Sequence, residues 1–406
     1  MMEKKQVDNS WHLVRNDNGE WISEENVVFI SHIEAGILQV RAAKNGKQLS
    51  VQYGPDGSLW CYKHGYEEIE ALEPERQVTT IRKLKIERIM EKKNKKDIYY
   101  DRAMSPNLEA IILKDFKWLI DEVIANPELD FQTGSNENDS WFSVYRGTGR
   151  VLTIKETGKI FAAPKYMALY PSFYTKPDKR GLATLLRLIQ KDGTLGRYYI
   201  GADGKKKEGY YQNLISRRYS LFCEPEDDFI IIDKEFVLGY HDEKAKETIS
   251  SPIIKKYDGI IRSLSETYEY CKNIKQSGTE CDFVGLTRQG DIMLLELKRH
   301  EDTTKIYLSP LQAGKYEDLT KEYARRYSED FNRNVINMVT QKINMGILKP
   351  KWPVPTVLSG KIFPAVVVGG NASKEAKKRF NIVRDAVGKD IALYTCDEKG
   401  KLIGVL

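Results

Sequence analysis

Short runs of alternating apolar and polar residues dominate the first 80 positions of the chain. Residues 37–41 and 49–53 show the two-residue period of β-strands, and Asn45-Gly46 between them is a typical hairpin turn. The pattern therefore predicts a small β-rich module over residues 1–80.

Lysine and arginine are concentrated in the next segment, residues 81–105. We expect a basic connector there, because a run of cations gains affinity for a polyanion by releasing its counterions. A solvated helix or linker without such a partner is the alternative interpretation, since charge runs are often only that.

Apolar residues return at helical intervals over residues 106–120, and the segment starts with a proline, which suits the first turn of a helix. Farther along, residues 151–154 and 159–161 are strand-like and flank a Thr-Gly turn. Residues 106–226 are therefore predicted to form a second β-rich module with one helix.

Aromatic and basic residues are interleaved between positions 165 and 218. Aromatic rings can stack on unpaired bases while cations hold phosphates, so this segment is a candidate nucleic-acid contact. The basic residues expected to make the contact are Lys205, Lys206, Lys207, Arg217 and Arg218. The alternative is that the tyrosines are ordinary sheet residues, with the ring buried and the hydroxyl near water.

Strand-like and helical runs alternate in the last part of the chain. Residues 228–233 and 235–240 read as paired strands, a helical run begins at Ser250, and residues 362–369 are almost wholly apolar, as in a buried strand. This alternation predicts an α/β domain with a mixed sheet over residues 227–406. The whole chain is then an α+β multidomain protein, with N-terminal β-rich modules ahead of this domain.

The candidate chemistry lies in a predicted hairpin of that domain. Residues 281–286 and 292–298 are strand-like and are separated by a turn that contains Gly290. Glu296 and Lys298 are two positions apart and share one face of the second strand, and pairing of the strands brings Asp282 near Glu296. Carboxylates are costly to bury without partners, but their oxygens suit a hard divalent cation.

The pattern of Asp282, Glu296 and Lys298 resembles the motif of the PD-(D/E)xK nucleases. Gln312 and Tyr316 follow, four positions apart, on a helix predicted to start at Ser309-Pro310. A Gln-x-x-x-Tyr pair after the E-x-K strand resembles the exonuclease-like branch of that superfamily. Cys281 stands where a proline is usual, and the resemblance covers roughly residues 245–370.

The resemblance implies a restriction-endonuclease-like core that holds Mg²⁺ or Mn²⁺ on Asp282, Glu296 and the backbone carbonyl of Leu297. Lys298 would lie by the attacking water and the charge that grows on phosphorus. Gln312 would orient the nucleotide or the lysine, and Tyr316 would donate a hydrogen bond to a phosphate.

The resemblance also implies a further metal-binding carboxylate on the helix that opens the core. The sequence leaves the choice open among four acidic residues near the helical run that begins at Ser250, namely Glu247, Asp258, Glu266 and Glu269.

The expected function is therefore a metal-dependent nuclease that cleaves phosphodiester bonds, with DNA favoured over RNA. The alternatives are a non-cleaving nucleic-acid-binding or scaffold protein that keeps the nuclease fold, and an RNA-directed nuclease. Long modules ahead of a small nuclease core fit sensing or self-inhibition, as in bacterial restriction or anti-phage defence. The sequence leaves the oligomeric state open, including a homo-oligomer.

Composition narrows the setting. The 406 residues are 41% hydrophobic and 30% charged, as in ordinary soluble proteins, and are too many for one core. No apolar run approaches the ~18 residues that span a bilayer, and the five cysteines are scattered, so we expect a cytoplasmic protein without a membrane partner. The net charge of +6 is mild, so partners must be inferred from local clusters.

Overall fold

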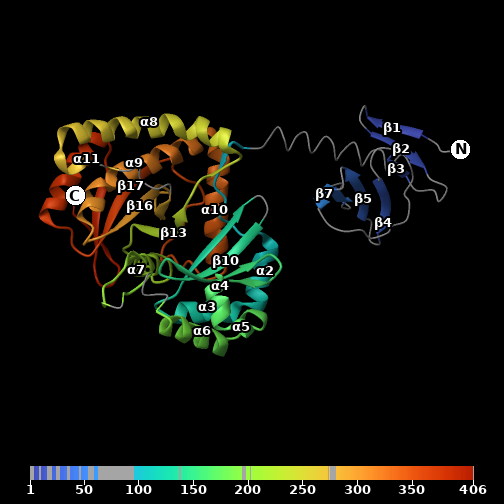
Figure 1. Cartoon of the computed structure of the whole chain (residues 1–406), viewed down its shortest axis with the longest axis horizontal. Coiled ribbons are helices and arrows are strands. Elements are labelled where there is room, and N and C mark those ends of the chain that lie inside the picture. The colour runs from blue at the N-terminus through green and yellow to red at the C-terminus, as the bar shows by residue number, and fades with distance from the viewer. Residues whose placement is uncertain are drawn as a thin grey trace. The chain divides into compact units, whose positions relative to one another are not determined.

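The computed structural model of the chain has two compact units, Met1–Lys96 and Asp97–Leu406 (Figure 1). From residue 96 onward, the structure describes residues 96–136, 139–193, 198–201, 203–272, 274 and 280–405. Before residue 96, it describes only the residues that form strands.

The described strands of the first unit form two antiparallel sheets. Three strands form one sheet in the order β1-β2-β3, with bounds Lys4–Asp8, Trp11–Arg15 and Trp21–Ser23. Four strands form the other in sequence order, namely β4 (Val28–Ile33), β5 (Ile37–Lys44), β6 (Lys47–Tyr53) and β7 (Leu59–Tyr62). The two strand-like runs singled out in the sequence lie within β5 and β6. The basic run up to residue 95 lies outside the described residues.

The second unit begins with a strand and two helices. The strand β8 (Ile98–Tyr99) is followed by α2 (Pro106–Asp115) and α3 (Lys117–Ala125). Ser105 caps α2 by accepting a hydrogen bond from the Leu108 amide at 3.1 Å, and Pro106 occupies the first turn as predicted.

A four-stranded antiparallel sheet follows, in the order β12-β11-β10-β9. Its strands are β9 (Asp130–Asn136), β10 (Asp139–Arg146), β11 (Gly149–Lys155) and β12 (Ile160–Phe161). The helices that come after it are α4 (Pro164–Leu169), α5 (Pro171–Thr175), α6 (Lys179–Lys191) and α7 (Glu208–Ser220). The prediction of one helix for residues 106–226 was therefore wrong, because short helices fill the segment that the sequence suggested was sheet.

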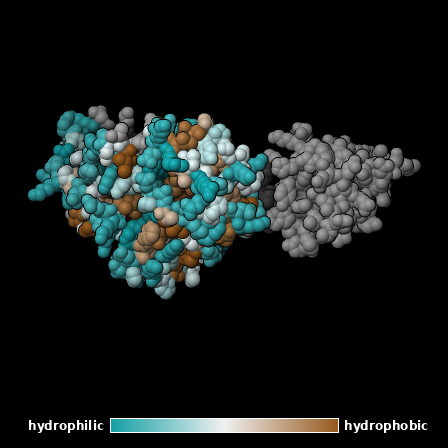
Figure 2. All heavy atoms as spheres, turned by 90° about the horizontal axis from the view of Figure 1, so that it is seen from below, coloured by the Kyte–Doolittle hydropathy of each residue, from teal (hydrophilic) through white to brown (hydrophobic). Residues whose placement is uncertain are grey.

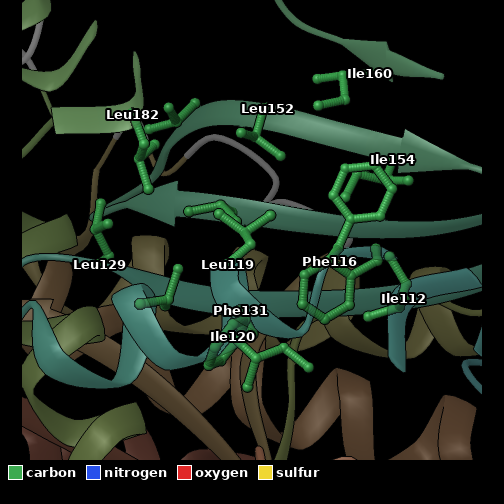
Figure 3. Close-up of a cluster of buried hydrophobic side chains, with 14 of the residues drawn as sticks. Ile112, Phe116, Leu119, Ile120, Leu129, Phe131, Leu152, Ile154, Ile160 and Leu182 are labelled. Carbon is green, nitrogen blue, oxygen red and sulfur yellow. The ribbon is translucent and has the colours of Figure 1, made fainter. Parts of the chain in front are cut away.

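The core of this module lies between the four-stranded sheet and its helices. Figure 3 shows Phe116, which lies between α2 and α3, and Leu119 of α3 packed against Leu152 and Ile154 of β11. Leu182 of α6 joins the same cluster. This burial gives the module a core separate from that of the C-terminal sheet.

The C-terminal sheet has six strands in the order β13-β15-β16-β17-β18-β19. Their bounds are Phe229–Phe236, Cys281–Thr287, Ile292–Arg299, Ile362–Gly369, Ala392–Cys396 and Leu402–Gly404. The β16, β17 and β18 neighbours are parallel, and the other neighbours are antiparallel. The predicted α+β class with a mixed C-terminal sheet is confirmed.

Helices cover both faces of this sheet (Figure 1). One face packs against α8 (Glu243–Thr267), α9 (Thr303–Arg326) and α11 (Lys374–Val387), and the 3₁₀ turn η2 (Glu269–Cys271) follows α8. The helix α10 (Ser328–Asn344) continues from α9. The opposite face packs against α7, whose Tyr211, Ile215 and Tyr219 meet residues of β15, β16 and β17.

A short strand pair joins the start of the second unit to the segment after β13. The strand β14 (Gly239–Tyr240) pairs with β8 in antiparallel register, Gly239 opposite Tyr99. Glycine at this position lets the Tyr99 ring approach, because a Cβ on Gly239 would lie 2.3 Å from it.

Two predicted helix starts were wrong. The helix α8 begins at Glu243, and α9 begins at Thr303, so Pro252 and Pro310 both lie inside helices. Pro310 has no amide proton for the carbonyl of Ile306, but the Ser309 hydroxyl donates to that carbonyl at 2.6 Å. The Ser-Pro pair therefore lies within the helix, where the serine hydroxyl replaces the hydrogen bond that the proline cannot donate, and does not mark the start of the helix.

The surface of the second unit is mainly hydrophilic on the face drawn in Figure 2, with hydrophobic side chains in separate small patches. Among the described residues, no helix combines the length and the apolar character needed to cross a membrane.

Candidate functional site

The predicted hairpin is present as β15 and β16. Phe283 pairs with Leu295, so the next position outward sets Asp282 opposite Glu296. The turn depends on Gly290, which has a φ of 84° and whose Cβ, if added, would lie 2.8 Å from the Val357 carbonyl oxygen. Glycine therefore fixes the register that brings the two carboxylates together.

The three charged side chains of the motif converge at the end of this hairpin. The amide of Leu297 donates a hydrogen bond to Asp282 Oδ2 at 2.6 Å. The ammonium group of Lys298 forms an ion pair with Glu296 Oε1. Glu296 Oε2 is buried and has no hydrogen-bond partner among the described residues. One carboxylate oxygen is thus left available inside the protein.

Burial makes these carboxylates harder to ionise. The pKa of Asp282 is raised well above its usual range by burial and then by the charge of Glu296. Burial also raises the pKa of Glu296 to about 7, against the opposing effect of Lys298. For Lys298, burial alone would lower the pKa, but the two carboxylates outweigh it and raise the pKa. The site therefore holds a firmly protonated lysine beside carboxylates that lack full compensation.

These residues open into a cleft of about 770 Å³. The hairpin of β15 and β16, the residue before it and α9 supply one part of its wall, formed by Glu280, Asp282, Glu296, Lys298 and Gln312. The rest of the wall comes from residues earlier in the chain, namely Arg102, Gln132, Tyr145, Thr148, Glu208, Glu235 and Val237. Both modules of the second unit therefore contribute to one cleft.

Gln312 and Tyr316 have different places at this cleft. Gln312 lines it and donates from Nε2 to the Tyr316 hydroxyl at 2.8 Å. Tyr316 is 2% exposed, and its hydroxyl donates to the backbone carbonyl of Glu280. Burial, followed by the charge of Glu296, raises the pKa of Tyr316. Tyr316 thus anchors the start of β15 and orients Gln312.

Three acidic residues of the cleft, Glu208, Glu235 and Glu280, were not assigned to the site from the sequence. Glu208 is the first residue of α7, and its charge raises the pKa of both Asp282 and Glu296. Glu235, at the end of β13, adds to the effect on Glu296. Glu208 comes close because Gly209 packs against the chain at Tyr198, where a Cβ would lie 2.1 Å from the carbonyl oxygen.

Arg102 also lines the cleft and holds Glu235 in place. Its Nη2 donates to the Glu235 carbonyl at 2.5 Å, and its Nε lies 3.4 Å from Asp233 Oδ2. Glu235 has a φ of 50°, a left-handed conformation that non-glycine residues rarely adopt. Its carboxylate accepts a hydrogen bond from Gln212, and burial together with Glu235 raises the pKa of neighbouring Glu280.

The four acidic residues proposed from the sequence lie elsewhere. Glu247, Glu266 and Glu269 are exposed, and Asp258 is half-buried on α8. The cleft is lined instead by Glu208 and Glu235. Within the described part of the chain, no three His, Cys, Asp or Glu side chains come close enough to hold a metal ion by themselves.

The proposed nucleic-acid contacts divide into two groups. Lys205 is exposed, Lys206 and Lys207 are half-buried, and the three directly precede Glu208 of the cleft. The ammonium of Lys206 lies 4.6 Å from the centre of the Tyr210 ring. Along the chain these lysines therefore precede a residue of the cleft wall, but none of the three lines the cleft itself.

Arg217 and Arg218 are structural, and their assignment to nucleic acid was wrong. Arg217 is 5% exposed and donates to three backbone carbonyls at 2.7–2.9 Å, those of Val123, Ile124 and Leu129. Arg218 pairs with Asp227 at 2.6 Å and Glu224 at 2.7 Å. The Arg217 guanidinium group is occupied by backbone carbonyls and that of Arg218 by carboxylates, so neither is available to bind a phosphate.

The aromatic residues of the same segment are mostly core residues. Tyr166, Phe173, Tyr174, Tyr199 and Tyr211 are all buried, whereas Tyr170, Tyr198 and Tyr210 are half-buried. The alternative interpretation of these tyrosines, as structural side chains, holds for the buried members.

Comparison of the chain with protein-family models, with curated proteins and with solved structures finds no match. The geometry and the chemistry of the cleft are therefore the indication of function in this chain.

Proposed function

We propose that the protein is a metal-dependent nuclease that hydrolyses phosphodiester bonds, with DNA favoured over RNA. The observation that carries the proposal is the convergence of Asp282, Glu296 and Lys298 at one end of a hairpin, inside a cleft of about 770 Å³. Buried carboxylates with perturbed pKa values are costly to stability, and such groups gather at functional sites.

The residues present fit a divalent cation such as Mg²⁺ or Mn²⁺. Glu296 Oε2 is buried without a hydrogen-bond partner among the described residues, and carboxylate and carbonyl oxygens are the ligands of hard cations. Asp282, Glu296 and the backbone carbonyl of Leu297 would hold the ion, and Glu208 of α7 is a further carboxylate in the same cleft. When bound, such an ion polarises a phosphate oxygen and lowers the pKa of a water.

Lys298 supplies the fixed positive charge of the site. The raised pKa keeps its ammonium group protonated, so it can donate hydrogen bonds to a water or to a phosphate oxygen. Glu296 holds that ammonium through Oε1 and prevents it from leaving the cleft. Gln312 lines the cleft with its amide oriented by Tyr316, and we assign it to positioning of the nucleotide.

The arrangement of elements supports membership of the PD-(D/E)xK superfamily and a restriction-endonuclease-like core. The resemblance implies a core that opens with a helix carrying an acidic residue next to the metal. The helix α7, with Glu208 in the cleft, meets that expectation better than α8 does. The core would then begin at residue 208 and include the mixed sheet from β13 onward.

The alternatives predict different behaviour of the same cleft. A non-cleaving nucleic-acid-binding or scaffold protein does not require a buried Glu296 oxygen without a hydrogen-bond partner among the described residues, beside a charged lysine. The presence of this oxygen therefore disfavours the non-cleaving alternative. An RNA-directed nuclease would use the same residues, so the choice of substrate is decided by experiment.

The test uses the full chain with single-stranded DNA, duplex DNA and RNA of one sequence. We expect cleavage with Mg²⁺ or Mn²⁺ and none with EDTA. Glu296→Gln should abolish it, whereas Glu266→Gln, at an exposed position of α8, should retain it. Wild-type rates in Glu296→Gln would refute the proposed site, and binding without cleavage under all metals would favour the scaffold alternative.

A further inference from the structure

A second cavity of about 540 Å³ adjoins the cleft. Its apolar wall consists of Phe236, Leu238, Tyr240, Ile254 and Leu319, from the end of β13, from β14 and from α8 and α9. Pockets of about 300–1,000 Å³ with apolar walls are typical sites for small organic groups.

The cavity shares a wall with the cleft. Val237 lines both spaces and is 38% exposed. On α9, Tyr316 lines the cavity while Gln312, which bonds to its hydroxyl, lines the cleft. A chemical group in the cavity can therefore belong to the same molecule as a phosphate in the cleft.

The charged side chains of the cavity do not favour a phosphate. Asp242 and Glu243 carry two negative charges, and Lys246 and Lys315 carry two positive ones. Lys246 is paired with Glu243 at 3.2 Å, and Asp242 caps α8 by accepting from the Ala245 amide at 2.8 Å. A neutral group with apolar faces and a few polar edge atoms matches this balance better than an anion does.

Two aromatic residues of the apolar wall are held by contacts within the protein. Phe236 is 3% exposed and meets the Tyr100 ring edge to face, with ring centres 4.8 Å apart. Tyr240 is held by the pairing of β14 with β8. Preformed aromatic walls lower the entropic cost of binding a flat ring.

We infer that this cavity receives an unpaired nucleobase next to the phosphate in the cleft, so that the substrate is single-stranded or locally unpaired nucleic acid. The inference rests on the proposed nuclease function. A base within an intact duplex must first be unstacked and unpaired, at a cost that favours strands already open. Stacking on aromatic side chains tolerates every base, so no sequence preference is required.

The test combines an abasic substrate with a variant that fills the cavity. Single abasic positions are placed along a short single strand whose cut site is mapped, and single-turnover rates are measured with Mg²⁺ or Mn²⁺. Ile254→Trp places a larger side chain in the cavity, and Val357→Trp, at a position that is 66% exposed and outside both spaces, is the matched control.

We expect one abasic position beside the cut to slow cleavage by about 5- to 150-fold, the range for losing one base–aromatic stack. Ile254→Trp should slow the intact strand similarly but leave the abasic strand nearly unchanged, which a merely misfolded variant would not do. Duplex should be cut more slowly than the single strand, and Val357→Trp should match the wild type.

The base pocket would be refuted if Ile254→Trp slowed cleavage of the intact and abasic strands equally, or if no abasic position slowed the wild type. Either result would leave the proposed nuclease function unaffected. If the wild type neither binds nor cuts any strand with either metal, the proposed function fails and this inference fails with it.

Discussion

Asp282 accepts a hydrogen bond from the amide of Leu297 at 2.6 Å, so a residue proposed to hold a metal also fastens the two strands of its hairpin. Glu296 has no comparable structural duty through Oε2, which is buried without a partner among the described residues. The two carboxylates should therefore respond differently to substitution.

Asp282→Ala should lower the free energy of unfolding by about 1–3 kcal/mol, because it leaves the buried Leu297 amide unsatisfied. Asp282→Asn keeps an acceptor oxygen and should lose less. Glu296→Gln keeps the side-chain volume and an oxygen that can accept from Lys298, and burial already raises the pKa of Glu296 to about 7, so its loss of charge should change stability little. All three variants should lack cleavage. Urea unfolding beside a cleavage assay checks this, and an unstable Glu296→Gln with a stable Asp282→Ala would contradict it.

Glu208→Gln should reduce the cleavage rate by at least about 10-fold at limiting Mg²⁺, because it removes one of the negative charges that face Asp282 and Glu296. Glu247→Gln, at an exposed position of α8, is the control and should match the wild type. The measurement is the rate against Mg²⁺ concentration. A larger loss of rate in Glu247→Gln than in Glu208→Gln would instead indicate that the further metal-binding carboxylate lies on α8.

Replacing Lys205, Lys206 and Lys207 together with glutamine should weaken DNA binding and reduce the slope of log affinity against log salt by about two to three units. The equivalent change of three α11 lysines, Lys374, Lys377 and Lys378, is the matched control and should leave the slope unchanged. Fluorescence anisotropy in EDTA gives both slopes without cleavage. Equal slopes in the wild type and in both triple variants would show that Lys205, Lys206 and Lys207 do not contact the DNA.

Acid should erase the stabilising effect of Glu322. Hydrogen bonds from Arg325, together with those from Arg326, lower the pKa of Glu322 to about 2, below the value of about 4.3 for glutamate in an unfolded chain. The stabilisation is therefore present above pH ~4.3 and is lost as the pH falls toward 2.

Glu322→Gln should consequently cost about 0.5–1 kcal/mol at pH 6, a value typical of an ion pair near the surface, and progressively less between pH 4.5 and 3. Urea unfolding across this range measures the difference, with Glu266→Gln as the exposed control on α8. A difference that grows on acidification would contradict the assigned pKa direction.

The hairpin of the site could be predicted because its information is local. Two apolar strands, a glycine turn and a fixed register lie within 281–299, so the sequence alone brings Asp282 to Glu296. Arg102, Glu208 and Glu235 could not be found in this way. Each reaches the cleft through packing of distant elements, such as the close approach of Gly209 to Tyr198, and no local pattern encodes that contact.

Arg217, Arg218 and Ser309-Pro310 show a second limit of prediction from the sequence. The charges of Arg217 and Arg218 are the same whether they face phosphate or buried carbonyls, so residue type alone cannot separate a binding surface from a helix cap. Ser309-Pro310 likewise matches a helix start, but the serine hydroxyl supplies the hydrogen bond that proline cannot. In both cases tertiary partners decided the outcome.

Residues 98–102, at the start of the second unit, are bound to the segment that forms part of the cleft wall. Within five residues after Asp97, Ile98 pairs with Tyr240, the Tyr100 hydroxyl bonds to Asp233 at 2.8 Å, and Arg102 grips the carbonyl of Glu235. A pull on the backbone at Asp97 is therefore borne by the same strand that forms one lip of the cleft. Displacing residues 98–102 should therefore also displace Glu235 in the wall of the cleft.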